Sequence, residues 1–400
     1  MTLSRRVTFW AIAAIVALYL AASAAPTPLY VVYQDEWGFS STTLTLVFAV
    51  YVFGLLASLL VLGALSDHVG RRPLIAVSLA LEVVAMVLFI VAGDVVVLGA
   101  ARTVQGVATG IALSSMGAAL VDLSPPESPG LAGVVSGLAP ISGLAIGALG
   151  SGFLVEYGPL PEQLVYIIVL VGLAAAALVA LWMPETSPRA PGALASLRPR
   201  VAVPEHARVE FLAMVPILTA TWSLGGLFLA LGPSVAAQIF DLSNHVVGGL
   251  VVTLLCGTGA VTIYALRNWT FAHALSFSAV FLVAGMAVSL VGLGVELALI
   301  AAIGTVVAGI GFGAAGRGTF GTIAQVARPH ERGALFAAFY VVSYLAFSLP
   351  ALAAGIADNA VGLRPTAIVY GAAVLVFSLA AILAQRRLAS RQARIAPVRL

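Results

Sequence analysis

The chain has 400 residues, of which 61% are hydrophobic and 9% are charged, and its net charge is +3. Ordinary soluble proteins carry roughly 25% charged residues, so a soluble fold of this length could not hide so much apolar surface. The 19 basic residues are scattered over short loops and form no basic stripe, which argues against nucleic-acid binding. Because one spanning helix needs about 20 apolar residues, the composition predicts a chain that crosses a membrane many times.

Twelve apolar windows of spanning length follow one another along the chain. The first six fall near residues 7–33, 42–64, 74–92, 95–121, 130–155 and 163–183. The second six fall near residues 211–238, 245–266, 271–293, 296–326, 333–356 and 365–384. The first window imitates a cleavable signal peptide, but its apolar run continues to Val32, so we expect it to remain as the first span.

Arginine positions predict the orientation of these spans. With the N-terminus inside the cell, 16 of the 19 basic residues lie on the cytoplasmic side. Only Arg364 lies in an outer loop, while Arg102 and Arg317 fall within spans. Cytoplasmic loops of membrane proteins are enriched in basic residues, so we predict that both termini are cytoplasmic. Heavy use of alanine, glycine and arginine is typical of GC-rich bacterial genomes, and we expect a bacterial inner membrane protein.

Residues 184–209 form the longest polar segment and contain five prolines and four arginines. This composition predicts a linker on the cytoplasmic face. It divides the chain into an N-terminal bundle (1–183), the linker (184–209), a C-terminal bundle (210–386) and a basic cytoplasmic tail (387–400).

The two halves share a spacing of glycine and proline. A shift of 203 places Gly106, Gly110, Pro126 and Gly130 over Gly309, Gly313, Pro329 and Gly333, and Tyr19 over Trp222. A shift of 205 places Pro28 over Pro233. This pattern predicts a parallel repeat of six spans, in which two bundles surround a site near the bilayer midplane.

The loop between the second and third windows carries the most specific motif. It reads Gly63-Ala64-Leu65-Ser66-Asp67-His68-Val69-Gly70-Arg71-Arg72. This loop resembles the G-x-L-a-D-r-x-G-r-r signature of the major facilitator superfamily, with His68 in place of the usual Arg or Lys. With the spans, the repeat and the central linker, the resemblance covers essentially the whole chain. It implies an all-α membrane protein with twelve transmembrane helices in two pseudo-symmetric six-helix bundles, which transports by alternating access without a cofactor.

The resemblance also implies a conformational latch on the cytoplasmic side. Asp67 would accept hydrogen bonds at the N-terminus of the eleventh span, near Gly333, where the helix dipole favours an anion. Arg71 or Arg72 would bridge to Asp122 at the inner end of the fourth span. The alternative is that the arginines only enforce topology. The predicted latch comprises Gly63, Asp67, Gly70, Arg71, Arg72 and Asp122.

Charged side chains within the spans are candidates for coupling. Such a group costs at least ~2.5 kcal/mol in lipid, so it should face a partner, water or substrate. Arg102 begins a stretch that resembles the fourth-span R-x-x-q-G pattern of the family, which implies a coupling role on the central path. The alternative is a structural arginine bound to carbonyls of the first span. Glu82 is a candidate proton carrier, because a low dielectric favours a neutral carboxyl. A structural role on a peripheral third span, or beside Arg102, is the alternative.

Five side chains are candidates for substrate binding. Tyr19, Gln105, Trp222 and Tyr344 would form an amphipathic lining suited to an uncharged or partly aromatic solute. Arg317 would contact an anionic cargo, or it would reach towards the inner membrane surface. For each aromatic ring, packing between helices is the alternative.

The expected function is proton-coupled export of a small, largely apolar compound or drug. Exporters of the family commonly carry G-P-x-x-G-G in the fifth span, and residues 147–152 keep the glycines without the proline. Uptake of a metabolite, proton-coupled or facilitative, is the alternative. We expect the chain to act as a monomer in the lipid bilayer, with its substrate and protons as partners.

An enzyme and a receptor are the rival classes. The five histidines lie in loops or near span ends, and no H-E-x-x-H, G-x-S-x-G or P-loop motif occurs. Cys256 is the single cysteine, so no intramolecular disulfide and no thiol metal site is supported. The repeat and the latch favour alternating access over a channel or a receptor without transport.

Overall fold

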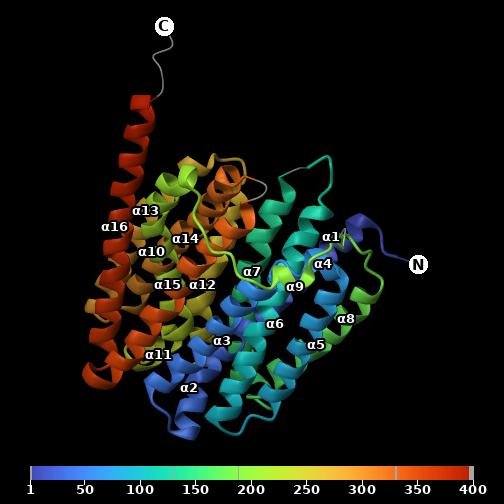
Figure 1. Cartoon of the computed structure of the whole chain (residues 1–400). Coiled ribbons are helices and arrows are strands. Elements are labelled where there is room, and N and C mark those ends of the chain that lie inside the picture. The colour runs from blue at the N-terminus through green and yellow to red at the C-terminus, as the bar shows by residue number, and fades with distance from the viewer. Residues whose placement is uncertain (1, 129, 188, 329–330, 396–400) are drawn as a thin grey trace.

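The computed structural model describes residues 2–128, 130–187, 189–328 and 331–395. This part of the chain consists of helices joined by loops (Figure 1) and contains no strand. Twelve helical segments in it are long and apolar enough to cross a membrane. The predicted fold class, twelve spans in two six-helix bundles, is therefore confirmed. Pro329 of the predicted repeat and residues 396–400 of the predicted tail lie outside the described residues.

The first and seventh spans are each interrupted at an equivalent place. The first consists of α1 (Arg5–Ala24) and α2 (Pro26–Trp37), and the seventh of α10 (Arg208–Ala230) and α11 (Gly232–Gln238). In both spans a proline occupies one of the first two positions of the second segment. Proline has no N–H to continue the hydrogen bonding of the preceding turns, so the helix restarts there.

The other spans are single helices. In the first half they are α3 (Ser41–Leu62), α5 (Arg71–Ile90), α6 (Val95–Asp122), α7 (Leu131–Tyr157) and α8 (Leu164–Leu181). In the second half they are α12 (His245–Ala265), α13 (Phe271–Gly294), α14 (Ala298–Val326), α15 (Arg332–Val361) and α16 (Leu363–Ile395). The short helices α4 (Ser66–Val69), α9 (Ala193–Ser196) and η1 (Glu205–Ala207) lie in the connections.

The two ends of the bundle differ in what they carry. The start of α1, the long connection with α9 and the end of α16 lie at one end, which we call the terminal face (Figure 1). The end of α2 and the starts of α3 and α12 lie at the other end, the opposite face. The arginine distribution predicts that the terminal face is cytoplasmic.

Glycines bring equivalent helices together in each half. A Cβ at Gly106 of α6 would overlap the carbonyl oxygen of Tyr51 on α3. A Cβ at Gly309 of α14 would lie 2.8 Å from the carbonyl oxygen of Leu255 on α12. Small residues of this kind allow helix backbones in membranes to approach closely. The glycine spacing that relates the halves in sequence thus corresponds to the same helix pair in each half.

The two halves pack directly on each other from the middle of α7 to the opposite face. The Thr253 hydroxyl on α12 donates to the carbonyl of Ala145 on α7 (2.9 Å). The Asn359 amide on α15 donates to the Thr42 hydroxyl on α3 (2.6 Å), which donates to the carbonyl of Gly355 (3.1 Å). Helix α7 therefore pairs with α12, and α3 pairs with α15. These two contacts close the opposite face.

We predict that Gly106→Ala destabilises the fold. The new methyl group would meet the Tyr51 carbonyl, so α3 and α6 would have to separate, at a cost of about 1–3 kcal/mol. Thermal unfolding of the detergent-purified protein should show a lower Tm. Gly99→Ala on the same helix is the matched control, because no atom of another described helix lies within 4 Å of its Cβ position. Equal melting temperatures for the two variants would contradict this account of the packing.

Candidate functional site

A buried arginine organises the interior of the first half. Arg102 on α6 is 1% exposed. Its Nη1 donates to the Gln105 Oε1 (2.7 Å) and to the carbonyl of Ser23 (2.9 Å), close to the interruption between α1 and α2. Its Nε donates to the Tyr30 hydroxyl on α2 (2.8 Å), and Nη2 donates to the same hydroxyl. One side chain therefore ties α6 to both segments of the first span.

Aromatic rings surround the same guanidinium. Its central carbon lies 5.3 Å from the ring centre of Tyr30, 5.2 Å from that of Tyr51 and 5.9 Å from that of Phe89. Ring faces attract a cation, most strongly where water is excluded. These contacts help to offset the removal of the Arg102 charge from water.

Glu82 on α5 lies inside the first half, with none of its side chain exposed. Its Oε1 accepts a hydrogen bond from the Gln105 Nε2 (3.2 Å). Its Oε2 has no hydrogen-bond partner among the described residues. Gln105 therefore stands between the acid and Arg102, and no direct ion pair joins the two among the described residues. Although α5 lies at the edge of the fold, this side chain points inward.

Hydroxyl groups extend this polar cluster. The Tyr19 hydroxyl donates to the Ser78 Oγ (3.0 Å), and the Tyr51 hydroxyl donates to the Ser23 Oγ (3.0 Å). Tyr19 is fully buried between α1 and α5, so it belongs to the interior of the first half. Sequence reasoning missed Ser23, Tyr30, Tyr51 and Ser78. Their only sequence signal is a hydroxyl group within an apolar run.

A second cluster, in the second half, is aromatic. The rings of Trp222 on α10 and Tyr344 on α15 pack edge to face with centres 5.0 Å apart. Phe347 lies 5.9 Å from Trp222, and Tyr340 stacks on Tyr344 at 6.0 Å. Phe347 also contacts Phe48 of α3, at 5.1 Å, so this cluster reaches the first half. We call these five residues the aromatic cluster.

Arg317 lies apart from both clusters. Its Nη2 donates to the carbonyl of Arg267 (2.7 Å), and its guanidinium lies over the Phe271 ring at 4.6 Å. These partners belong to the α12–α13 loop and the start of α13, at the terminal face. The described contacts of this side chain hold that loop.

The loop at 63–72 forms an ionic cluster at the terminal face of the first half. The Arg71 Nε lies 3.3 Å from the Asp122 Oδ2, and Nη1 pairs with the Asp67 carboxylate and donates to the Ser66 Oγ (2.6 Å). Asp67 is half exposed, and none of its described contacts is with α15. In this conformation Asp67 is bound within its own half.

Glu185, which sequence reasoning missed, attaches the central connection to this cluster. Its Oε1 accepts from the backbone N of Arg71 (2.8 Å), and its Oε2 accepts from that of Arg72 (3.3 Å). Gly70 has φ +123°, and a Cβ there would lie 2.6 Å from the Glu185 Oε2. Only glycine adopts this positive φ without strain and also leaves room for the Glu185 carboxylate.

The ionised form of Glu185 is favoured by its surroundings. Partial burial acts to raise its pKa, but backbone hydrogen bonds from Ser187, Arg71, Arg72 and Thr186 outweigh that effect, so the pKa is lowered. The Thr186 hydroxyl adds a bond to the Asp122 Oδ2 (3.0 Å). Residues 185–187 are therefore part of the ionic cluster.

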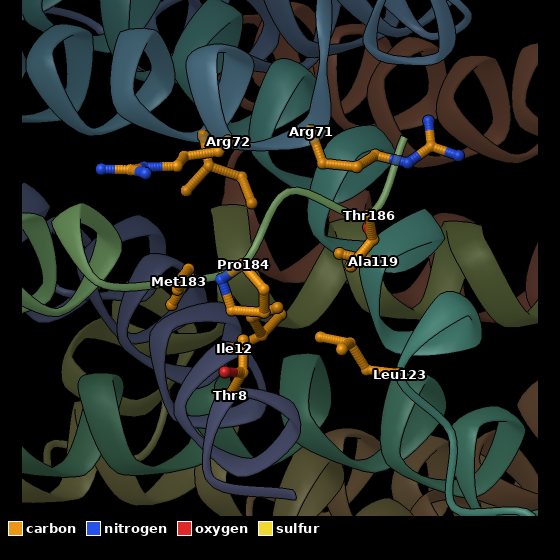
Figure 2. A pocket seen from close by; sticks show the side chains of 10 residues that line it. Thr8, Ile12, Arg71, Arg72, Ala119, Leu123, Met183, Pro184 and Thr186 are labelled. Carbon is orange, nitrogen blue, oxygen red and sulfur yellow. The ribbon is translucent and has the colours of Figure 1, made fainter. Parts of the chain in front are cut away.

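A small cavity lies beneath this attachment. Figure 2 shows it between Thr8 and Ile12 of α1, Arg71 and Arg72 of α5, and Pro184 of the connection. Its volume of about 10 Å³ has room for about one water molecule. It is too small for a substrate.

A family model matches most of the chain. The sequence profile described as Major Facilitator Superfamily matches residues 11–351. Among curated proteins, the transporter paaT of Penicillium rubens is 31% identical over 122 residues. That match covers 30% of this chain and 22% of the relative, so the chain matches less than a quarter of the relative's length.

Solved structures share the fold over almost the whole chain. The human organic anion transporter MFSD10 (TETRAN) superposes with a TM-score of 0.68 at 18% identity, covering 95% of this chain and 100% of that one. A bacterial homologue of the human lysosomal transporter Spinster, inward-facing and unoccupied, has a TM-score of 0.75 at 14% identity over 96% and 98%. A POT family transporter in complex with 5-aminolevulinic acid has a TM-score of 0.75 at 12% identity over 95% and 96%. At these identities the likeness concerns the fold alone.

We predict that Glu185→Ala releases the connection from the ionic cluster. The backbone N–H groups of Arg71 and Arg72 would lose their acceptor, and a loss of about 1.4 kcal/mol, towards the lower end of the usual range, is tenfold in the opening equilibrium. Hydrogen exchange measured by mass spectrometry should therefore be about tenfold faster in peptides that contain these amides. The matched control is Glu205→Ala, whose side chain is 89% exposed.

The contact of the Glu185 carboxylate with the backbone N–H groups of Arg71 and Arg72 should depend on pH. Because the attached state lowers the pKa of Glu185, its stabilisation is complete at neutral pH. It is lost as the pH falls through the lowered pKa. In acid, the hydrogen exchange of the Arg71 and Arg72 amides, corrected for the pH dependence of the intrinsic exchange rate, should approach the exchange in Glu185→Ala. Protection that is unchanged in the variant or in acid would contradict this role.

Proposed function

The chain belongs to the major facilitator superfamily, and on that premise we propose that it exports a small, largely apolar compound in exchange for protons. That it is a membrane transporter of a small molecule follows from the family. The observation that carries the proton coupling is Glu82, a fully buried carboxyl that is joined through Gln105 to Arg102 and of which one oxygen has no hydrogen-bond partner among the described residues.

The coupling step is the gain and loss of a proton on Glu82. A neutral Glu82 is stable where it lies, with Gln105 donating to its Oε1. An ionised carboxylate at the same place needs a positive partner, because a lone charge in a low dielectric is costly. Arg102 is the nearest described cation along the hydrogen-bonded chain. Loss of the proton would therefore draw Arg102 towards Glu82.

Such a movement would be transmitted to the first span. If Arg102 moved, its hydrogen bonds to the carbonyl of Ser23 and to the hydroxyl of Tyr30 would break. The segments α1 and α2 would then lose their shared partner. The Tyr51 hydroxyl links the Ser23 Oγ to α3, and α3 packs against α15. The two protonation states of Glu82 thus favour two arrangements of the halves, which is the requirement for coupling.

The aromatic cluster is the proposed contact surface for the substrate. Trp222, Phe347 and Tyr340 are partly exposed, and the cluster contains no charged side chain. Flat apolar rings bind other flat apolar groups through area and ring geometry. A site of this kind fits a largely apolar, partly aromatic compound. In this proposal Tyr19 and Gln105 act in coupling, and Arg317 holds a loop.

The ionic cluster is proposed to act as the latch in the other conformation. It makes α4, α5, α6 and residues 185–187 one unit at the terminal face. A half-exposed Asp67 is then free to bind the N-terminus of α15 when the terminal face closes. We place the protein in a bacterial inner membrane with that face in the cytoplasm.

We predict that Glu82→Gln uncouples transport from protons. In proteoliposomes with an imposed pH gradient, gradient-driven ethidium accumulation should fall at least roughly tenfold, because an amide carries no exchangeable charge. Ethidium exchange without a gradient should persist. The control is Glu205→Gln, an exposed acid on the connection. Full gradient-driven accumulation in Glu82→Gln would remove this residue from the mechanism, and accumulation in the reverse direction would indicate uptake.

We predict that Trp222→Ala weakens substrate binding. Loss of the central ring of the aromatic cluster should raise the KM for ethidium by about twofold to tenfold, since an aromatic ring contact contributes about 0.5–1.5 kcal/mol. The matched control is Trp10→Ala, which is 50% exposed on the outside of α1. The same KM in both variants would show that the aromatic cluster only packs helices.

A further inference from the structure

A histidine–carboxylate pair joins the two halves at the opposite face. Glu156 lies one residue before the end of α7, and His245 is the first residue of α12. The Glu156 Oε2 accepts from the His245 Nδ1 (2.8 Å) and from the backbone N of the same residue (2.9 Å). The two side chains are 26% and 30% exposed, so protons reach them from the solution on that face.

The surrounding backbone holds this pair in place. A Cβ at Gly152 would lie 2.5 Å from the carbonyl oxygen of His245, so the end of α7 and the start of α12 touch directly. The Asn244 side chain caps α12 by accepting from the backbone N of Val246 (2.9 Å). Glu156 thus stands at a capped helix N-terminus, where its charge is favoured. Helix α7 cannot leave α12 at this face without breaking both of its bonds to His245.

We propose that His245 is a proton-binding residue of the transport cycle, which with Glu156 holds the opposite face closed when it is protonated. This proposal rests on the proposed proton-coupled function and adds a second protonation site to it. A proton on His245 turns a neutral hydrogen bond into an ion pair. When the halves separate at this face, that ion pair is lost. Acid on the opposite face therefore favours the closed arrangement, and removal of the proton favours opening.

Other charges near the pair do not replace this interaction. Of the helices packed against α12, α7 carries Glu156 and α2 carries Asp35 and Glu36, while α11 carries no charged residue. The charged residues of α10 and α14 lie at the terminal face. Asp241 lies in the loop before α12. Among the described residues, only Glu156 forms an ion pair with His245.

The direction of this effect suits an exchanger. A proton bound to His245 from the opposite face would hold that face closed. The protein with this proton would therefore be open at the terminal face. There Glu82 can release its proton, and substrate can bind. Proton binding at His245 thereby disfavours opening to the side from which the proton came.

Spin labels can test the pair without any transport assay. Labels on Val96→Cys and Leu299→Cys would report the separation of α6 and α14 at the opposite face, where these side chains are 76% and 73% exposed. The background would carry Cys256→Ala and Glu82→Gln, which removes the buried cysteine and the other proposed titrating group. The purified full chain in nanodiscs would be measured at about pH 5.5 and about pH 8, on either side of the ordinary pKa of histidine.

We expect the widely separated population to increase about twofold to fivefold at the higher pH. His245→Asn keeps a donor but does not titrate, so its population should be the same at both values. Glu156→Gln, which cannot form the ion pair, should also lose the response. The control is His273→Asn on α13, where the histidine contacts Thr270, and it should keep the response.

A response that survives in His245→Asn or in Glu156→Gln would overturn the proposal, as would its absence from the parent protein. These outcomes are separate from a failure of proton coupling at Glu82, because Glu82 is absent from the background. Gradient-driven transport that persists in Glu82→Gln would challenge the proposed function. It would not change the conclusion about His245 that is drawn from the distances between the two spin labels.

Discussion

The placement of one positive charge inside a low-dielectric helical bundle sets the arrangement of the first half. The Arg102 guanidinium has left water, so its N–H groups need acceptors and its charge needs compensation. The carbonyl of Ser23, the Tyr30 hydroxyl and the Gln105 amide supply the acceptors, and three rings supply their faces. These partners come from both segments of the first span, so the position of that span depends on Arg102. In the proposed coupling, a change in the charge of Glu82 would reach the first span through the same few bonds.

The second half shows how the equivalent pair of helices packs without a buried charge. The 203-residue shift places Gly285 over Glu82, Thr305 over Arg102 and Ala308 over Gln105. A Cβ at Gly285 would overlap the backbone N of Ala308, so α13 and α14 are in direct backbone contact where α5 and α6 hold a polar bridge. The Thr305 hydroxyl bonds within its own helix, to the carbonyl of Ala301. The same helix pair is thus stable without ionisable groups. An α5–α6 type of helix pair therefore does not in itself require the Glu82–Gln105–Arg102 chain, which favours a functional role for that chain.

How much could be read from the sequence depends on the physical origin of each feature. Span number follows from apolar length, and the repeat of the two halves follows from the spacing of glycine and proline. Both are local properties of the chain. The inward direction of Glu82 could not be predicted, because a helix that is apolar on all sides has no preferred face. Glu185 and Tyr30 were missed because their roles depend on partners that lie 113 to 114 and 72 positions away in sequence. The role of Arg317 was left open for the same reason, because its partners in the α12–α13 loop lie close to it only in the folded chain.

The strengths of the contacts at the two faces also differ, and alternating access needs that difference. The ionic cluster at the terminal face joins parts of one half and the connection, and it can stay intact while the halves rock. The bonds at the opposite face cross between the halves and must break in every cycle. A partly exposed ion pair contributes only about 0.2–1 kcal/mol, which is enough to bias two states and too little to trap one of them. A buried pair in that position would carry the cost of removing two charges from water and would be cut off from the protons of the solution. The partial exposure of His245 and Glu156 is therefore what allows their contact to act as a gate.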